Sequence, residues 1–123
     1  MDLSLTDDDL AFQAEVRALI AATFPPPEWY DASGGHESRW HAALMEKGWA
    51  ANKWPVAFGG TGWSATRNFI WEREVSVAGL PGQVGGMGMG MLAPILFAFG
   101  SPEQQTRFLP DILHDRVRWC QGY

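Results

Sequence analysis

The chain has 123 residues, which is long enough for one domain with its own core. Hydrophobic residues make up 46% and charged residues 19%, a composition typical of globular proteins and not of disordered ones. The formal net charge is −5 and the nine basic residues are scattered, which excludes the basic footprint of a nucleic-acid-binding protein. The single cysteine, Cys120, excludes an internal disulfide framework and fits a reducing compartment, so we expect a cytoplasmic location. The longest weakly polar run, 84–100, is short for a membrane span and rich in glycine, so no span is expected.

The first predicted helix covers residues 7–23. Thr6 is a natural N-cap, Asp9 stands at the third helical position, and apolar residues follow at helical spacing. The prolines of 25–27 should end this helix. Residues 28–35 are predicted to form a loop, and a second helix is expected over 37–47, with Gly48 as a left-handed cap.

The segment 47–62 joins this helix to a third one. Its glycines permit backbone angles closed to other residues, and Pro55 disfavours helix at Trp54. We interpret this segment as a structural joint that packs Trp49 and Trp54 between helices and against a further domain, and not as a phosphate loop. Ser64 then caps a predicted helix over 65–78, which residues 79–81 end.

Residues 82–99 combine glycine with methionine and other apolar side chains. Gly82, Gly86 and Gly90 lie four positions apart, so on a helix they would form one stripe without side chains. A neighbouring apolar stripe would contain Met87, Met91, Ile95 and Phe99. These spacings predict a buried helix with a glycine groove, bent at Pro94 and ended by Gly100.

The last helix is predicted to begin at Ser101, with Pro102 at the first position and Gln104 completing a capping box. Pro110 should interrupt it before a short turn over 111–114. Residues 117–123 alternate in a β-like pattern, with no partner strand expected within the chain. The sequence therefore predicts an all-α fold, an orthogonal or up-down bundle of five to six helices with a short terminal β-like segment.

No complete catalytic constellation is found. His36, Glu37 and His41 are reminiscent of a zinc motif, but the second histidine falls at i+5, so the two histidines cannot share a metal there. Asp7, Asp8 and Asp9 are typical helix-start charges. Cys120 is interpreted as a core or interface cysteine, and no metal site is expected.

Five segments, taken in order, are similar to the N-terminal α-helical domain of the acyl-CoA dehydrogenases. They are AEVRALI at 14–20, EKGW at 46–49, WPVAFGGTG at 54–62, APILFAFGSPEQQTRFLPDIL at 93–113 and RWCQGY at 118–123. The Gly-Ser-Pro-Glu-Gln segment followed by Phe-Leu-Pro is the most specific. Ala57 and Phe58 depart from the family pattern, which usually has an acidic residue and then tyrosine at these positions.

The resemblance implies oxidation of an acyl-CoA thioester to the 2-enoyl-CoA by an FAD-dependent enzyme. It implies that residues 1–116 form the helical domain and that 117–123 begin the middle β-domain. Gln121, Gly122 and Tyr123 would belong to the flavin-contacting stretch, and the catalytic glutamate would lie outside this chain, which alone should be inactive. Five residues fall in the part of the family helix that lines the acyl cavity: Gly82, Gln83, Gly86, Met87 and Gly90.

The resemblance also implies an acyl-CoA substrate, an electron-transfer acceptor and a homo- or hetero-oligomer as partners. Two interpretations of the glycine stripe stay open, a wide cavity for a bulky or long acyl group and close helix packing. The alternative function is a non-catalytic helical assembly module, such as a flavin-poor subunit of a heteromeric dehydrogenase.

Overall fold

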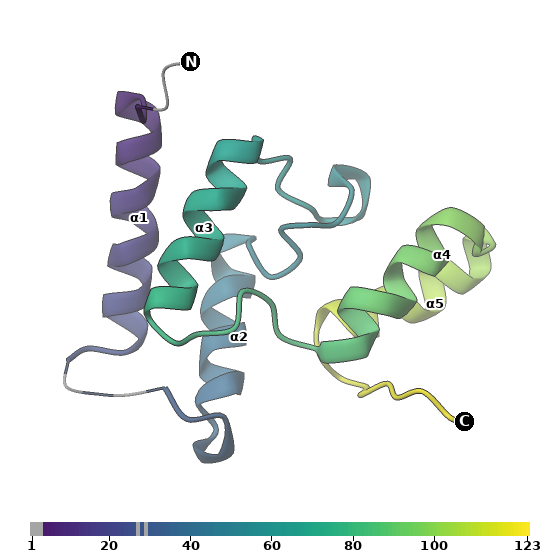
Figure 1. The fold of residues 1–123 in the computed structure, drawn as a ribbon. Helices are drawn as coiled ribbons and strands as arrows, with labels where there is room; N and C mark the ends of the chain where they lie inside the picture. The colour runs from purple at the N-terminus through teal and green to yellow at the C-terminus, as the bar shows by residue number, and fades with distance from the viewer. Residues whose placement is uncertain (1–3, 27, 29) are drawn as a thin grey trace. The chain divides into compact units, whose positions relative to one another are not determined.

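The structure is a computed structural model that describes residues 4–26, 28 and 30–123. Its helices, coloured along the chain in Figure 1, are α1 (Asp7–Thr23), α2 (His36–Lys47), α3 (Ala65–Val77), α4 (Ala93–Phe99) and α5 (Pro102–Leu113). Short 3-10 turns occupy Ala32–Gly34 and Val56–Phe58, and a π-helical turn occupies Gly88–Leu92. No strand forms in the described residues, including 117–123, so the predicted all-α fold is confirmed.

The predicted helix starts are confirmed at the level of individual hydrogen bonds. Thr6 and Ser101 each form a complete capping box, with Asp9 and with Gln104 respectively. The Ser64 side chain accepts a hydrogen bond from the backbone N–H of Arg67. Each cap satisfies a backbone donor that has no partner within its helix, so these short local patterns determine where α1, α3 and α5 begin.

The ends of α1 and α2 also follow the prediction. Phe24 is the C-cap of α1, just before the prolines, of which Pro27 lies outside the described residues. Gly48 has a φ of +73° after the end of α2, the left-handed backbone that glycine adopts at low cost.

Two predictions about helix boundaries are wrong. The helix expected over 82–99 begins only at Gly86, and the π-helical turn precedes Pro94, which stands in the first turn of α4. Pro110 does not interrupt α5, which continues to Leu113. Because proline lacks an N–H, it removes one hydrogen bond from the helix, and packing of the buried residues Leu109 and Ile112 on either side retains the helix here.

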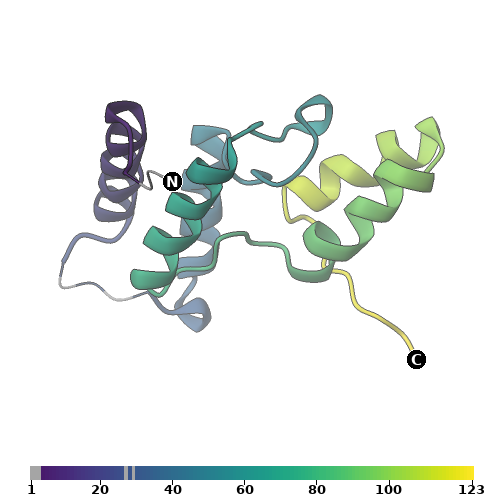
Figure 2. The ribbon, with the colours of Figure 1, turned by 45° about the horizontal axis from the view of Figure 1, so that its top comes forward.

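The chain divides into two compact units. The first contains the residues up to Ala43 together with Trp63–Gly82, and in it α1 lies alongside α3 (Figures 1 and 2). Its core is aromatic: Trp40 stacks on Trp71 with ring centroids 6.0 Å apart, and both side chains are fully buried. Their indole N–H groups donate to the carbonyls of Pro81 and Gly82, which satisfies both buried donors.

The second unit contains Leu44–Gly62 and Gln83–Tyr123, and in it α4 packs beside α5 (Figure 2). Trp54 lies in its core, where the indole N–H donates to the Met89 carbonyl at 3.3 Å and the ring meets Phe97 edge-on. Gly60 passes so close to the Trp54 carbonyl that a Cβ on it would lie 1.6 Å from that oxygen. The Lys47–Gly62 segment thus packs Trp54 into the core of this unit, and its packing against a further domain stays a prediction.

Candidate substrate and cofactor surface

The outer face of the π-helical turn and α4 is apolar and exposed. The exposed fractions of Met87, Met91, Ile95 and Phe99 are 43%, 46%, 56% and 86%. The sequence predicts this stripe correctly but also predicts that it is buried, which is wrong for this chain: the inward residues Met89, Ala93 and Leu96 form the core instead. An apolar stripe this long is unusual on the surface of a domain and marks a face that takes an apolar partner or ligand.

The stripe forms one wall of a hollow of about 190 Å³ in the second unit. Met87, Met91 and Ile95 face Trp119, Cys120 and Gln121 across it. The fold therefore brings a predicted acyl-cavity residue, Met87, next to a predicted cofactor contact, Gln121, although 34 positions of sequence part them (121 − 87).

The three glycines of the predicted stripe do not act as a unit. Gly82 precedes the helix, and a Cβ on it would lie 3.6 Å from the Trp71 indole, so it packs in the first unit. Gly86 and Gly90 have nothing within 4 Å of the place where a Cβ would stand, so no other described element of the second unit packs closely against them. Gly86 has a φ of +54°, which disfavours any other residue there.

Gln83, the remaining predicted cavity residue, lies half-buried in the bend before the helix. Its side-chain Nε2 is buried and has no hydrogen-bond partner among the described residues. Neither Gln83 nor the stripe glycines are among the residues that line the hollow.

The predicted cofactor contacts Gln121, Gly122 and Tyr123 are all exposed. They belong to the segment that leaves α5 without helix or strand, drawn in yellow in Figure 2. The Tyr123 hydroxyl donates to the Gln121 side-chain oxygen at 2.8 Å. Cys120 is an exposed free thiol, so of the two predicted locations, core or interface, the core is wrong for this chain.

Trp119 is the residue of this surface that sequence reasoning missed. Its ring packs against the core of the second unit and meets Phe108 edge-on, with centroids 5.7 Å apart. Its indole N–H is buried and has no hydrogen-bond partner among the described residues. The alternating pattern around Trp119 does not predict that its indole packs into the core. That position becomes visible through the close approach of Gly88, which is far away in sequence.

A larger hollow of about 410 Å³ lies in the same unit, between the 54–58 turn and α5. Trp54, Phe58 and Leu109 give it an apolar wall, and Thr106 and His114 add polar groups. Pro110 also lines it and cannot donate to the Thr106 carbonyl one turn earlier in the helix. No residue singled out as a candidate substrate or cofactor contact lies in this hollow.

In the first unit, Glu74 is a buried carboxylate held between α1 and α3. It is 7% exposed and accepts hydrogen bonds from Arg17 Nε at 2.8 Å, Arg17 Nη2 at 3.0 Å and Gln13 Nε2 at 2.8 Å. The bonds from Arg17 hold the pKa of the Glu74 carboxyl below its usual range, against burial, which raises it. Because the hydrogen-bond donors Arg17 and Gln13 both belong to α1, this carboxylate of α3 joins the two helices.

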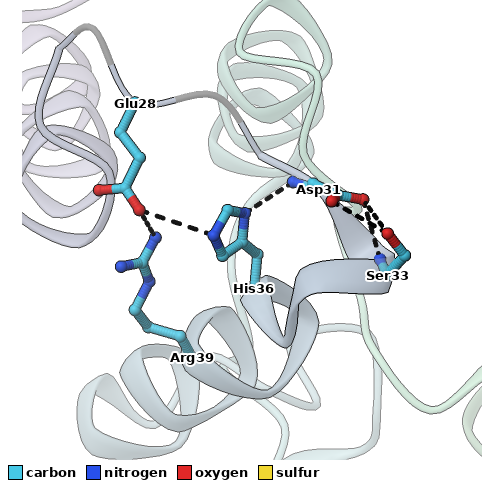
Figure 3. A network of polar contacts seen from close by, with 5 residues as sticks. All are labelled: Glu28, Asp31, Ser33, His36 and Arg39. Carbon is cyan, nitrogen blue, oxygen red and sulfur yellow. Dashed lines mark hydrogen bonds and ion pairs between the residues drawn. The ribbon is translucent and has the colours of Figure 1, made fainter.

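Of the rejected zinc candidates, His36 lies in a separate polar network in the same unit (Figure 3). His36 Nδ1 accepts the backbone N–H of Asp31 at 2.9 Å, and its Nε2 lies 3.6 Å from Glu28. Glu28 also pairs with Arg39. Hydrogen bonds from Ser33 lower the pKa of the Asp31 carboxyl. Both ring nitrogens of His36 thus contact residues of the segment that precedes α2. Among the described residues, no group of three or more His, Cys, Asp or Glu side chains is placed to hold a metal ion.

The fold and this surface define an all-α domain with an exposed apolar helix face beside an exposed polar segment. Residues 6–116 match the sequence model of the family described as acyl-CoA dehydrogenase, N-terminal domain, and the chain belongs to this family.

Relatives with established names support the same assignment. The chain is 40% identical over 84 residues to acyl-CoA dehydrogenase IpdE1 of Mycolicibacterium smegmatis, covering 68% of this chain and 21% of that protein. It is 30% identical over its whole length to acyl-CoA dehydrogenase FadE26 of Mycobacterium tuberculosis, covering 32% of it. The crystal structure of the ChsE4–ChsE5 complex from Mycobacterium tuberculosis is similar at a TM-score of 0.74 and 29% identity, over 96% of this chain and 30% of that one. The chain thus spans about a fifth to a third of the length of these three proteins.

Within the described residues, none of the helices combines the length and apolar character needed to cross a membrane.

Proposed function

We propose that this chain is the N-terminal domain of an FAD-dependent acyl-CoA dehydrogenase, an oxidoreductase that converts an acyl-CoA thioester to the 2-enoyl-CoA. The observation that carries the proposal, beyond the family, is the shared hollow: the exposed Met87–Met91 face and the Gln121 segment line it together. An enzyme of this kind must place an apolar acyl chain next to a flavin. The apolar Met87–Met91 face suits the acyl chain, and the polar Gln121 segment suits the flavin. The catalytic base lies outside this chain, so the chain alone is inactive.

In this proposal the π-helical turn and α4 supply one wall of the acyl cavity. Met87 and Met91 carry unbranched, polarizable side chains that adapt to different apolar shapes. Gly86 and Gly90 leave the space beside them open. This arrangement favours the cavity explanation of the glycines over close helix packing, because no other described helix of the second unit approaches within 4 Å of where a Cβ on either glycine would stand. The predicted roles of Gly82, Gln83, Gly86 and Gly90 in the cavity remain proposals, since none of these four residues lines the hollow.

Gln121, Gly122 and Tyr123 are the residues that would hold FAD. Their exposed amide, backbone and phenol groups fit the hydrogen-bonding edge of a flavin ring, and the Trp119 indole N–H beside them is a buried donor with no partner among the described residues. FAD, when bound, supplies the hydride acceptor. The residues of this chain would bind and orient the cofactor and exclude water from it. Most of the FAD site is expected from the rest of the protein.

The full-length protein would pass its electrons to an electron-transfer acceptor and would act as a homo- or hetero-oligomer in the cytoplasm, on fatty-acid or other lipid-derived acyl groups. The heteromeric ChsE4–ChsE5 complex supports an oligomer. The single exposed cysteine supports a reducing compartment.

The test is Gly90→Phe in the full-length protein, with Gly90→Ala as the matched control. A phenyl group at this open position should enter the cavity and lower kcat/KM for large acyl-CoAs by roughly tenfold more than for small ones. Gly90 suits this test better than Gly86, where positive φ would strain any side chain. An equal loss for both substrate classes would contradict the cavity role.

A second candidate function is a helical assembly module, such as the flavin-poor subunit of a heteromeric dehydrogenase. The observation that favours it is the heteromeric assembly of the similar ChsE4–ChsE5 structure. Flavin content per chain of the purified full-length protein separates the two: about one FAD per chain supports the enzyme, and FAD bound only after a second, different chain is added supports the module.

A further inference from the structure

Gly88 is the one glycine of the π-helical turn that another part of the chain approaches closely. A Cβ on Gly88 would lie 2.9 Å from Cδ1 of Trp119 and 3.4 Å from a methyl carbon of Ile112. Carbon atoms at optimal contact are about 3.5–4.0 Å apart, so even an alanine would overlap with the indole ring. Gly90, two positions on in the same turn, has nothing within 4 Å.

The overlap cannot be relieved by a flexible chain end, because Cδ1 belongs to a rigid ring. That ring also meets Phe108 edge-on, and it packs against the core that contains Ile112 and Leu109. A side chain at Gly88 would therefore push Trp119 outward by about half an ångström or more, which is the difference between 2.9 Å and normal carbon contact.

Trp119 is followed directly by the exposed Cys120–Tyr123 segment. It is the last residue of the chain that packs into the core of the second unit, so its seat determines where the next residues leave the protein surface. Its indole also lines the hollow opposite Met87 and Met91. The position of one ring thus sets both one wall of the hollow and the start of the segment that carries Gln121.

We propose that Gly88 and Trp119 form a positioning pair that orients the Gln121–Tyr123 segment toward the cofactor. Gly88 leaves the space in which the Trp119 indole packs, and the packed indole fixes the place from which residues 120–123 continue. Neither residue needs to touch the reacting atoms. This inference rests on the proposed function for its consequence, since Gln121–Tyr123 are cofactor contacts only there, but the seat itself is a feature of this fold.

The test uses Gly88→Ala in the full-length protein with Gly90→Ala as the matched control, and hydrogen–deuterium exchange as the first readout. Gly88→Ala should speed exchange of the peptide that contains residues 117–123, and Gly90→Ala should leave it unchanged. The second readout is the FAD dissociation constant of the apo-protein, measured well below the unfolding temperature. It should rise roughly tenfold in Gly88→Ala, since displacing the segment weakens its hydrogen bonds to FAD.

A double-mutant cycle with Trp119→Ala completes the test. Once the indole is removed, Gly88→Ala should have no further effect on FAD affinity, because its effect passes through Trp119. Equal exchange of residues 117–123 in Gly88→Ala and Gly90→Ala would refute the claim that Gly88 fixes the position of Trp119. Faster exchange with unchanged FAD affinity would overturn the positioning role. A wild-type protein that binds no FAD would refute the proposed function instead, and the exchange result would still decide on the seat.

Discussion

The buried carboxylate of Glu74 offers a sharp test of how α1 and α3 are held together. Glu74→Gln keeps the shape of the side chain but removes its charge, and it places an amide NH2 among donors from Arg17 and Gln13. Hydrogen bonds to a buried charged group are worth about 1.5–3 kcal/mol. Because the Arg17 side chain is 61% exposed and water competes for it, we expect a loss of about 1–2 kcal/mol in the free energy of unfolding.

The effect should depend on pH in a defined direction. Since the pKa of Glu74 is lowered in the folded protein, the unfolded chain binds the proton more readily. The stabilisation is therefore complete above the pKa of a glutamate in the unfolded chain, about 4.3, and is lost as the pH falls through the lower folded value. The difference between wild type and Glu74→Gln should accordingly shrink on acidification.

Urea unfolding followed by tryptophan fluorescence at several pH values measures both quantities. Glu72→Gln is the matched control, since it removes an exposed carboxylate from the same helix and should change stability by no more than about 0.5 kcal/mol. The reasoning is refuted if Glu74→Gln is no less stable than Glu72→Gln at neutral pH, or if its deficit stays constant down to pH values at which Glu74 is protonated.

Two further substitutions test the second unit by the same unfolding measurement. Gly60→Ala should cost more than about 3 kcal/mol, because its Cβ would overlap with the Trp54 carbonyl, while Gly90→Ala should be neutral or stabilising; similar midpoints for the two would contradict the close approach. Ser101→Ala should cost about 1 kcal/mol by removing the capping box of α5, whereas Ser76→Ala inside α3 should not; a Ser101→Ala protein as stable as wild type would show that the cap is dispensable.

The features that the sequence predicts well are those decided within a few residues. The caps at Thr6, Ser64 and Ser101 each depend on a side chain and a backbone N–H three positions away, so the pattern and the structure agree. Gly48 likewise adopts the left-handed backbone expected from its place after a helix. The apolar stripe of Met87, Met91 and Ile95 also follows from spacing, though not its exposure.

The errors lie where distant parts of the chain decide the outcome. Pro110 disfavours a helix locally, but Leu109 and Ile112 on the inner face bury enough apolar surface to retain it. Gly82 has the right spacing for the glycine stripe, yet its carbonyl is held by the Trp71 indole, so the helix begins later. For the candidate site, spacing identifies Met87 and resemblance identifies Gln121, while Trp119 is found only through its contact with Gly88.

The most direct test of the central claim is to add acyl-CoA to the purified full-length protein without oxygen, while recording the visible flavin spectrum and the mass of the thioester. We predict that the flavin band bleaches and that the acyl-CoA loses two hydrogens, and that the 123-residue chain does neither. A full-length protein whose bound flavin stays oxidised while the acyl-CoA remains unchanged across short, long and ring-bearing acyl groups would contradict the account.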